Sequence, residues 1–204
     1  EKLDGMQQKN GMKKLILDLR QNPGGYLDQA ALMADEFLAG SKNIVYTEGR
    51  TMPRTYEKAS NMGLFEEGKL IILIDEGSAS ASEIVSGAMQ DWDRGILIGR
   101  RTFGKGLVQQ EYPLGDGSSV RLTVAKYFTP SGRCIQRIDY THRSASGIAS
   151  ALADSLRQTF KTKNGRMVKD GAGIEPDIKT EDEKVAEITI ALYTKNHIFD
   201  FANK

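Results

Sequence analysis

The chain has 204 residues, of which 39% are apolar and 27% charged, and its formal net charge is +1. This length allows one domain with a substantial core, and the near balance of charge gives no field that favours nucleic acid or an anionic membrane. No apolar run approaches the roughly 20 residues that cross a bilayer. The single cysteine, Cys134, excludes an internal disulfide framework and a thiolate metal cluster.

The first predicted unit is a strand, a turn and a helix. Residues 15–19 form a short apolar run that is typical of a buried strand, and the glycine-rich turn at 22–25 ends it. Residues 26–40 follow with apolar side chains at helical spacing and a terminal glycine. Residues 43–57 then predict a β-hairpin.

The same order of elements recurs in the middle of the chain. A buried strand is predicted at 70–74, a helix from about residue 79 to 92, and a further buried strand at 95–99. Alternating strands and helices favour an α/β fold with right-handed crossovers and a largely parallel sheet. Ligand sites in such sheets lie at the carboxyl ends of strands. We therefore expect the turns at 22–25 and 76–82 to meet.

The last third of the chain is more polar. Residues 117–130 alternate in character and predict a strand that ends at Pro130. A helix is predicted within 149–160, a turn at Asn164 and Gly165, and an amphipathic helix over 181–196.

Three serines alternate with alanines at the start of the helix predicted from about residue 79 to 92. Serine is a preferred N-cap, and Ser80 with Glu83 fits a capping box, so a purely structural role is open. The free N–H groups of a helix N-terminus also stabilise negative charge, which favours a nucleophilic serine there. Both readings hold together if Ser78 or Ser82 bonds to the backbone while Ser80 reacts.

A nucleophilic serine needs a base. Neither His142 nor His197 lies near a predicted strand end or glycine turn, and no G-x-S-x-G elbow is present. Lys105 is the leading alternative, because it stands between Gly104 and Gly106 with apolar neighbours. A lysine that acts as a base must lose its proton, and desolvation favours its neutral form.

The stretch 99–106 also matches seven of the eight positions of a phosphate-binding P-loop. Its last position holds Gly106, where a hydroxyl should bind magnesium, and a β-prone segment stopped by Pro113 follows in place of a helix. We therefore expect no nucleotide and no other cofactor.

Three segments carry a resemblance to a known family. Residues 15–25 (LILDLRQNPGG), 74–109 (IDEGSASASEIVSGAMQDWDRGILIGRRTFGKGLVQ) and 173–178 (GIEPDI) resemble the carboxyl-terminal processing peptidases, or tail-specific proteases. The resemblance implies a serine endopeptidase with a Ser–Lys dyad, which cleaves near the C-terminus of protein substrates through an acyl-enzyme. It also implies substrates that bind in extended form, and a location in the periplasm or otherwise outside the inner membrane.

The resemblance further implies residue roles. It makes Ser80 the nucleophile, Lys105 the general base and Gln109 the residue that orients the lysine. If 105–109 is a strand, Lys105 and Gln109 share one face, because side chains alternate along a strand. The oxyanion hole would use backbone N–H groups of Ala81 and of Gly24 or Gly25, which gives the two donors that a tetrahedral oxyanion requires.

The implied fold is a ClpP/crotonase-like core of repeated ββα units with a mixed, largely parallel sheet. We expect a single catalytic domain over residues 1–204, with an insert-like segment at 137–172. The family's PDZ domain, which binds a substrate C-terminus by strand addition, is expected elsewhere in the full-length protein and not in this chain.

Two other function classes remain open. A non-catalytic peptide-binding or scaffolding module would keep the fold but not need the dyad, whereas crotonase-type acyl-CoA chemistry predicts no Ser–Lys pair. Among neighbouring residues, Thr102 is expected to order the lysine loop or the turn backbone, and Asp91 and Trp92 to be structural.

Overall fold

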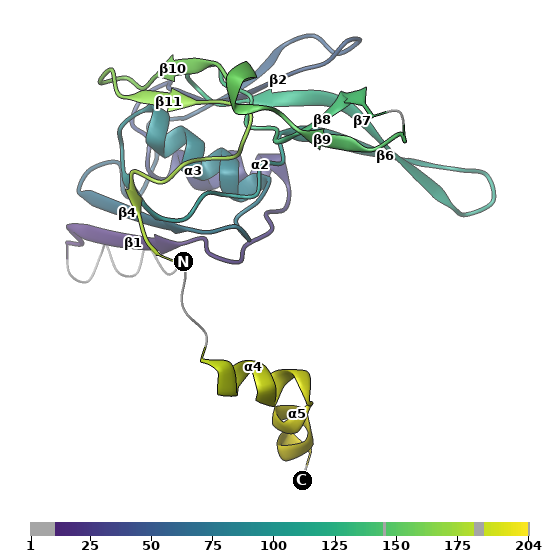
Figure 1. Cartoon of the computed structure of the whole chain (residues 1–204). Helices are drawn as coiled ribbons and strands as arrows, with labels where there is room; N and C mark the ends of the chain where they lie inside the picture. Colours follow the sequence, from purple (N-terminus) through teal and green to yellow (C-terminus); the bar gives the residue numbers. More distant parts are fainter. Residues whose placement is uncertain (1–10, 145, 182–185, 204) are drawn as a thin grey trace.

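The computed structural model describes residues 11–144, 146–181 and 186–203, which include two four-stranded sheets with helices between them (Figure 1). The first sheet is parallel and has the order β1 (Lys14–Asp18), β4 (Lys69–Ile74), β5 (Ile96–Gly99) and β12 (Ile178–Lys179). The second is antiparallel, in the order β3 (Thr55–Lys58), β2 (Asn43–Glu48), β7 (Ser119–Phe128) and β6 (Leu107–Pro113). The helices between the sheets are α2 (Leu27–Asp35) and α3 (Ala81–Asp91).

The core lies where both sheets cover α3. Every residue of α3 is buried, and the helix packs on β2 of one sheet and β5 of the other. Leu70, Ile72 and Ile74 alternate along β4 with their buried faces toward the core. A helix without a solvent-exposed stripe is stable in a globular protein only between two covering layers.

The predicted strands and helices of the first half are present, with two differences. Parallel and antiparallel pairing occur in separate sheets and not in one mixed sheet, because the hairpin β2–β3 pairs with β7. The expected buried strand at 15–19 is present as β1 but is not buried throughout. It lies at a sheet edge, and Ile16 is 63% exposed.

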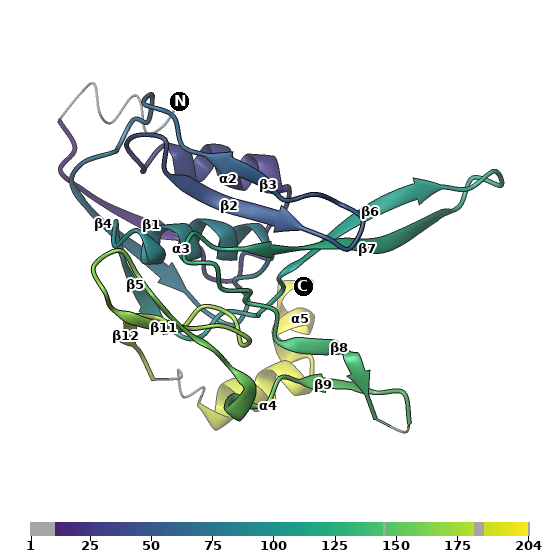
Figure 2. The same ribbon diagram turned by 90° about the horizontal axis from the view of Figure 1, so that it is seen from above.

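β6 and β7 form a long hairpin that projects from the body of the protein (Figure 2). β6 begins at Leu107, and the register shifts between Val108 and Gln109. The condition under which Lys105 and Gln109 would share one strand face is therefore not met, because Lys105 precedes β6 and a bulge interrupts the alternation of side chains.

The segment 137–172 consists of short elements: β8 (Ile138–Arg143), β9 (Ala149–Ala151), the 3-10 turn η1 (Asp154–Leu156), β10 (Thr159–Lys161) and β11 (Met167–Lys169). The helix predicted within 149–160 is wrong. Its first residues pair with β8, and Leu152 donates its N–H to the carbonyl of Arg137, so tertiary pairing overrides the helical spacing. The turn predicted at Asn164 and Gly165 does connect β10 to β11.

The described C-terminal residues form α4 (Glu187–Thr194) and α5 (His197–Ala202), which pack on each other. α4 falls within the helix predicted over 181–196, of which residues 182–185 lie outside the described residues. Every described side chain of these two helices is exposed. Within the described ranges, no helix has both the length and the apolar content needed to cross a membrane.

Asp91, at the end of α3, forms a buried ion pair with Arg133. Arg133 Nη2 lies 2.8 Å from Asp91 Oδ1, and each side chain is 1% exposed. We expect Asp91→Ala to lower the free energy of unfolding by about 3–5 kcal/mol, because it leaves a buried charge without its partner. Urea unfolding measures the change. The exposed pair Asp18–Arg20 is the control, since Asp18→Ala should cost no more than about 1 kcal/mol. Equal losses in the two variants would contradict the assignment.

Candidate active site

The turns that follow β1 and β4 lie against each other, as the topology predicts. The strands are parallel neighbours, so their carboxyl ends share one edge. Asp75 Oδ1 accepts the N–H of Gln21 at 2.9 Å, and Ala79 donates its N–H to the Asn22 carbonyl at 3.0 Å. These bonds fix the glycine turn beside the serine-rich turn.

The three serines of that turn differ in their hydrogen bonds. Ser78 Oγ donates to the Leu19 carbonyl at 2.7 Å, and Ser82 Oγ donates to the Asn22 carbonyl at 3.0 Å. The Ser80 hydroxyl donates to no group in the described part of the chain. Ser80 also has φ 55° and ψ −113°, a conformation that is costly outside glycine and that occurs most often at functional sites.

Glu83 connects the turn that carries Ser80 to the loop that carries Lys105, which we call the lysine loop. Its Oε2 accepts the backbone N–H groups of Ser80 at 2.8 Å and of Lys105 at 2.9 Å. Its Oε1 accepts the Thr102 hydroxyl at 2.5 Å and the Gly104 N–H at 2.8 Å. The capping contact predicted between Ser80 and Glu83 is present, and the same carboxyl also fixes the backbone of Lys105.

The Glu83 side chain is fully buried. Burial raises the pKa of its carboxyl, and the four donated hydrogen bonds oppose that shift. Thr102, which donates to Glu83, also accepts the N–H of Ile174 at 2.7 Å. Thr102 thus orders the lysine loop in the way the sequence suggests, and it joins that loop to the segment 173–178.

Tyr127, on β7, also contacts the backbones of Ser80 and Lys105, but at their carbonyl groups and not at their N–H groups. Its hydroxyl lies 3.1 Å from the carbonyl of Ser80 and also contacts that of Lys105, so its single proton is shared between the two carbonyls. Burial, followed by the negative charge of Glu83, raises the pKa of Tyr127 well above its ordinary value, so the hydroxyl stays a donor. We call Glu83 and Tyr127 the clamp. Tyr127 could not be singled out from the sequence, because its inward position in the alternating strand β7 is the one signal it gives.

A cleft of about 640 Å³ holds the predicted catalytic groups. Ser80, half-buried Lys105 and exposed Gln109 all line it, together with Gly25 and Ala81. The expected sharing of one strand face by Lys105 and Gln109 does not apply, but both side chains border the same cleft. The structure therefore gathers residues that the sequence separates.

The glycine turn brings Gly25 to the cleft wall. Gly24 has φ +90°, and a Cβ there would lie 2.6 Å from the Ala81 nitrogen, so only glycine allows this close approach. The Gly24 N–H is occupied by Asn22 Oδ1 at 2.9 Å. Gly25 lines the cleft, and Ala81 is the first residue of α3, where an N–H has no acceptor within the helix.

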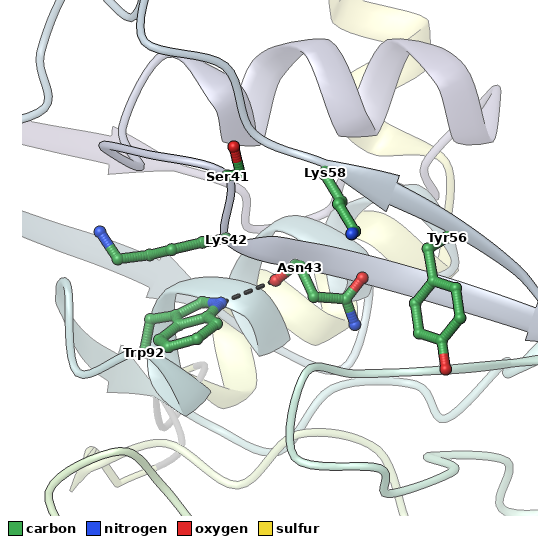
Figure 3. Close-up of a pocket in the computed structure, with 6 residues that line it drawn as sticks. All are labelled: Ser41, Lys42, Asn43, Tyr56, Lys58 and Trp92. Carbon is green, nitrogen blue, oxygen red and sulfur yellow. Dashed lines mark hydrogen bonds between the residues drawn. The ribbon is translucent and has the colours of Figure 1, made fainter.

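A second cavity, of about 440 Å³, lies beside Trp92 at the other end of α3 (Figure 3). Trp92 Nε1 donates to the Asn43 carbonyl at 2.7 Å, and Lys42 and Lys58 also border the cavity. An 11-residue helix is about 16 Å long, so this cavity is separate from the cleft at Ser80. Trp92 is structural, as its sequence context suggests.

His142 and Cys134 do not line the cleft. His142 is 88% exposed beside Asp139, and Cys134 is half-buried, with a thiol pKa raised by burial. Among the described residues, no group of three His, Cys, Asp or Glu side chains is arranged to hold a metal ion.

Comparisons with known proteins place this arrangement in a family. The sequence profile of peptidase family S41 matches residues 1–144. A carboxy-terminal-processing protease of Bartonella bacilliformis is 50% identical over 131 residues, which are 64% of this chain and 30% of that protein. A probable CtpA-like serine protease of Staphylococcus epidermidis is 43% identical over 129 residues, which are 62% of this chain and 26% of that protein.

A solved structure agrees with these sequence matches. A photosystem II D1 C-terminal processing protease superposes with a TM-score of 0.62 and 30% identity, covering 86% of this chain and 36% of that one. The chain spans about a third or less of the length of these relatives. Since the family profile covers more than half of the residues, this chain belongs to peptidase family S41.

Proposed function

We propose that the chain is the catalytic part of a serine endopeptidase that acts near the C-terminus of protein substrates through a Ser80–Lys105 dyad. Neutral Lys105 takes the Ser80 proton as the hydroxyl oxygen attacks a peptide carbonyl. The N–H groups of Ala81 and Gly25 stabilise the oxyanion. Lys105 then protonates the leaving amine, and water hydrolyses the acyl-enzyme with the same lysine as base.

One observation carries this proposal: the clamp holds Ser80 and Lys105 to each other through their backbones. Glu83 accepts both N–H groups, and the single hydroxyl proton of Tyr127 is shared between both carbonyls. Catalysis by a base requires a fixed separation from the nucleophile. The clamp supplies such a fixed separation between the backbones of the two residues, and this supports the proposed dyad. Gln109 then orients the amine from the exposed side of the cleft.

The surroundings favour Gly25 over Gly24 as the second oxyanion donor, because the N–H of Gly24 is already bonded to Asn22. An apolar pocket of about 150 Å³ adjoins Gly25 and Ala81, and its walls include Ala30, Met33 and Val85. We infer that this pocket takes an apolar side chain next to the scissile bond of an extended substrate.

Further parts of the proposal rest on the family. The full-length protein would carry a PDZ domain that captures substrate C-termini, and it would work in the periplasm or elsewhere outside the inner membrane. The two sheets and their crossovers would be a variant of the ClpP/crotonase-like ββα plan, with 1–204 as one catalytic domain and 137–172 as its insert. A non-catalytic peptide-binding module on the same fold is the alternative that the first experiment decides.

Labelling with a fluorophosphonate tests the nucleophile. We expect the probe to form a covalent bond with Ser80, because the hydroxyls of Ser78 and Ser82 already donate hydrogen bonds to backbone carbonyls. Peptide mapping by mass spectrometry identifies the labelled residue. Ser80→Ala should abolish labelling, and Ser41→Ala, in the separate cavity, should not change it. Attachment to another serine, or no attachment to the full-length protein, would favour the non-catalytic module.

A further inference from the structure

A polar pocket of about 590 Å³ lies where the carboxyl end of α3 meets the segment 154–169. Gln90, in the last turn of α3, borders it, whereas Ser80 lies before the first turn. The pocket is therefore apart from the catalytic cleft. Five of its lining side chains are basic: Arg101, Arg133, Arg157, Arg166 and Lys169.

Arg133 has a buried donor for which the described residues provide no acceptor. Its side chain is 1% exposed, and Nη2 donates to Gln90 Oε1 at 2.7 Å and to Asp91 Oδ1 at 2.8 Å. Nη1 donates to the Lys169 carbonyl at 3.3 Å. Nε is buried and has no acceptor among the residues that the structure describes.

Arg157, which also lines the pocket, likewise has a buried N–H donor without an acceptor among the described residues. Its side chain is 5% exposed, Nε donates to the Asp170 carbonyl at 2.7 Å, and Nη1 donates to Asp154 Oδ1 at 3.0 Å. Nη2 is buried and finds no acceptor in the described ranges. The two guanidinium groups donate to the carbonyls of the consecutive residues Lys169 and Asp170, and both side chains line the pocket.

The carboxylates of the pocket are already engaged. Asp177 accepts Arg166, the Gln90 amide and the Leu97 N–H. Glu175 forms ion pairs with Arg101 and Lys179. A buried N–H of a charged group that lacks an acceptor bears its whole desolvation cost. An acceptor for these two donors has to come from outside these side chains, and a negatively charged one would also offset the charge of the guanidinium groups.

We propose that this pocket binds a small oxyanion, a phosphate or a carboxylate, whose oxygens accept from Arg133 Nε and Arg157 Nη2. Guanidinium donors match the geometry of both kinds of anion. Arg133 belongs to the core and Arg157 to the segment 137–172. A bound oxyanion thus bridges that insert to the end of α3, which gives the insert a role that is independent of the proposed peptidase activity.

Calorimetric titration with inorganic phosphate, and separately with acetate, tests the site in the full chain at constant ionic strength set by chloride. We expect saturable binding of at least one of these anions, and a higher melting temperature with it. Arg157→Gln should weaken binding about tenfold or more, since one hydrogen bond to a charged group is lost. Asp154, the partner left behind, is 87% exposed, so this variant leaves no buried carboxylate unpaired.

Arg54→Gln is the matched control, because Arg54 pairs with Glu48 on the β2–β3 hairpin and does not line the pocket. It should bind like the parent. If circular dichroism shows that Arg157→Gln is unfolded, Arg157→Lys, which keeps the charge without the second donor, carries the same expectation. Binding of phosphate alone identifies a phosphate-type anion, and binding of acetate identifies a carboxylate. Absence of saturable binding of both, or equal affinity in parent and Arg157 variant, overturns the proposal.

Discussion

Lys105→Met is expected to lower kcat/KM for cleavage of an unstructured polypeptide by about 10²- to 10⁴-fold, the usual contribution of a general base. Methionine keeps the length of the stem but has no group that accepts a proton. The backbone contacts of residue 105 with the clamp use its N–H and carbonyl, so they survive the change. The fold should therefore be unaffected, and the loss should appear in the chemical step.

Two further variants make this result specific. Lys105→Arg keeps the positive charge but cannot act as a base, because a guanidinium does not lose its proton in proteins. It should be as inactive as Lys105→Met. Lys126→Met, at an exposed position on the neighbouring strand β7, should keep the parent's rate. Activity in the arginine variant would mean that residue 105 supplies charge and not proton transfer.

Much of the fold could be predicted because it depends on local signals. Apolar runs and small-residue turns place β4, α3 and β5 within about two residues of their observed bounds, 69–74, 81–91 and 96–99. The pairing of β2 with β7 could not be predicted, because it joins residues Tyr46 and Phe128, which are distant in the chain. The same limit explains the error at 149–160, where pairing with β8 overrides an apolar spacing that fits a helix.

The candidate site shows a similar division. Ser80 and Lys105 stand out because their neighbours are small or glycine, and the turn at Gly24 stands out because its backbone must be permissive. The clamp gives no such signal. Glu83 fits an ordinary helix cap, and Tyr127, 22 residues after Lys105, fits an ordinary core position. The groups that Glu83 and Tyr127 contact in Ser80 and Lys105 are backbone N–H and carbonyl groups. Such groups are present at nearly every residue, so these contacts leave no pattern in a sequence.

Glu83→Gln is expected to reduce both peptidase activity and stability, and activity more strongly. An amide has one oxygen, so it can still accept from Thr102 and Gly104 but then directs its NH₂ group at the N–H groups of Ser80 and Lys105. Buried donors without an acceptor cost about 1–3 kcal/mol each. We expect the free energy of unfolding to fall by at least about 2 kcal/mol, as measured by urea denaturation.

The separate effect on activity shows whether Glu83 positions the dyad or only stabilises the fold. At a temperature where the variant is fully folded, kcat should fall at least tenfold with little change in KM, because the distance between Ser80 and Lys105 is no longer held. Tyr127→Phe removes the opposite half of the clamp and should lower kcat in the same way.

Glu36→Gln is the control, since Glu36 accepts the N–H of Leu64 and does not line the cleft. If Glu83→Gln and Tyr127→Phe both lost stability while kcat stayed unchanged, the clamp would be a feature of the fold alone. A loss of kcat confined to Glu83→Gln and Tyr127→Phe requires that the same contacts that stabilise the two turns also set the geometry of proton transfer.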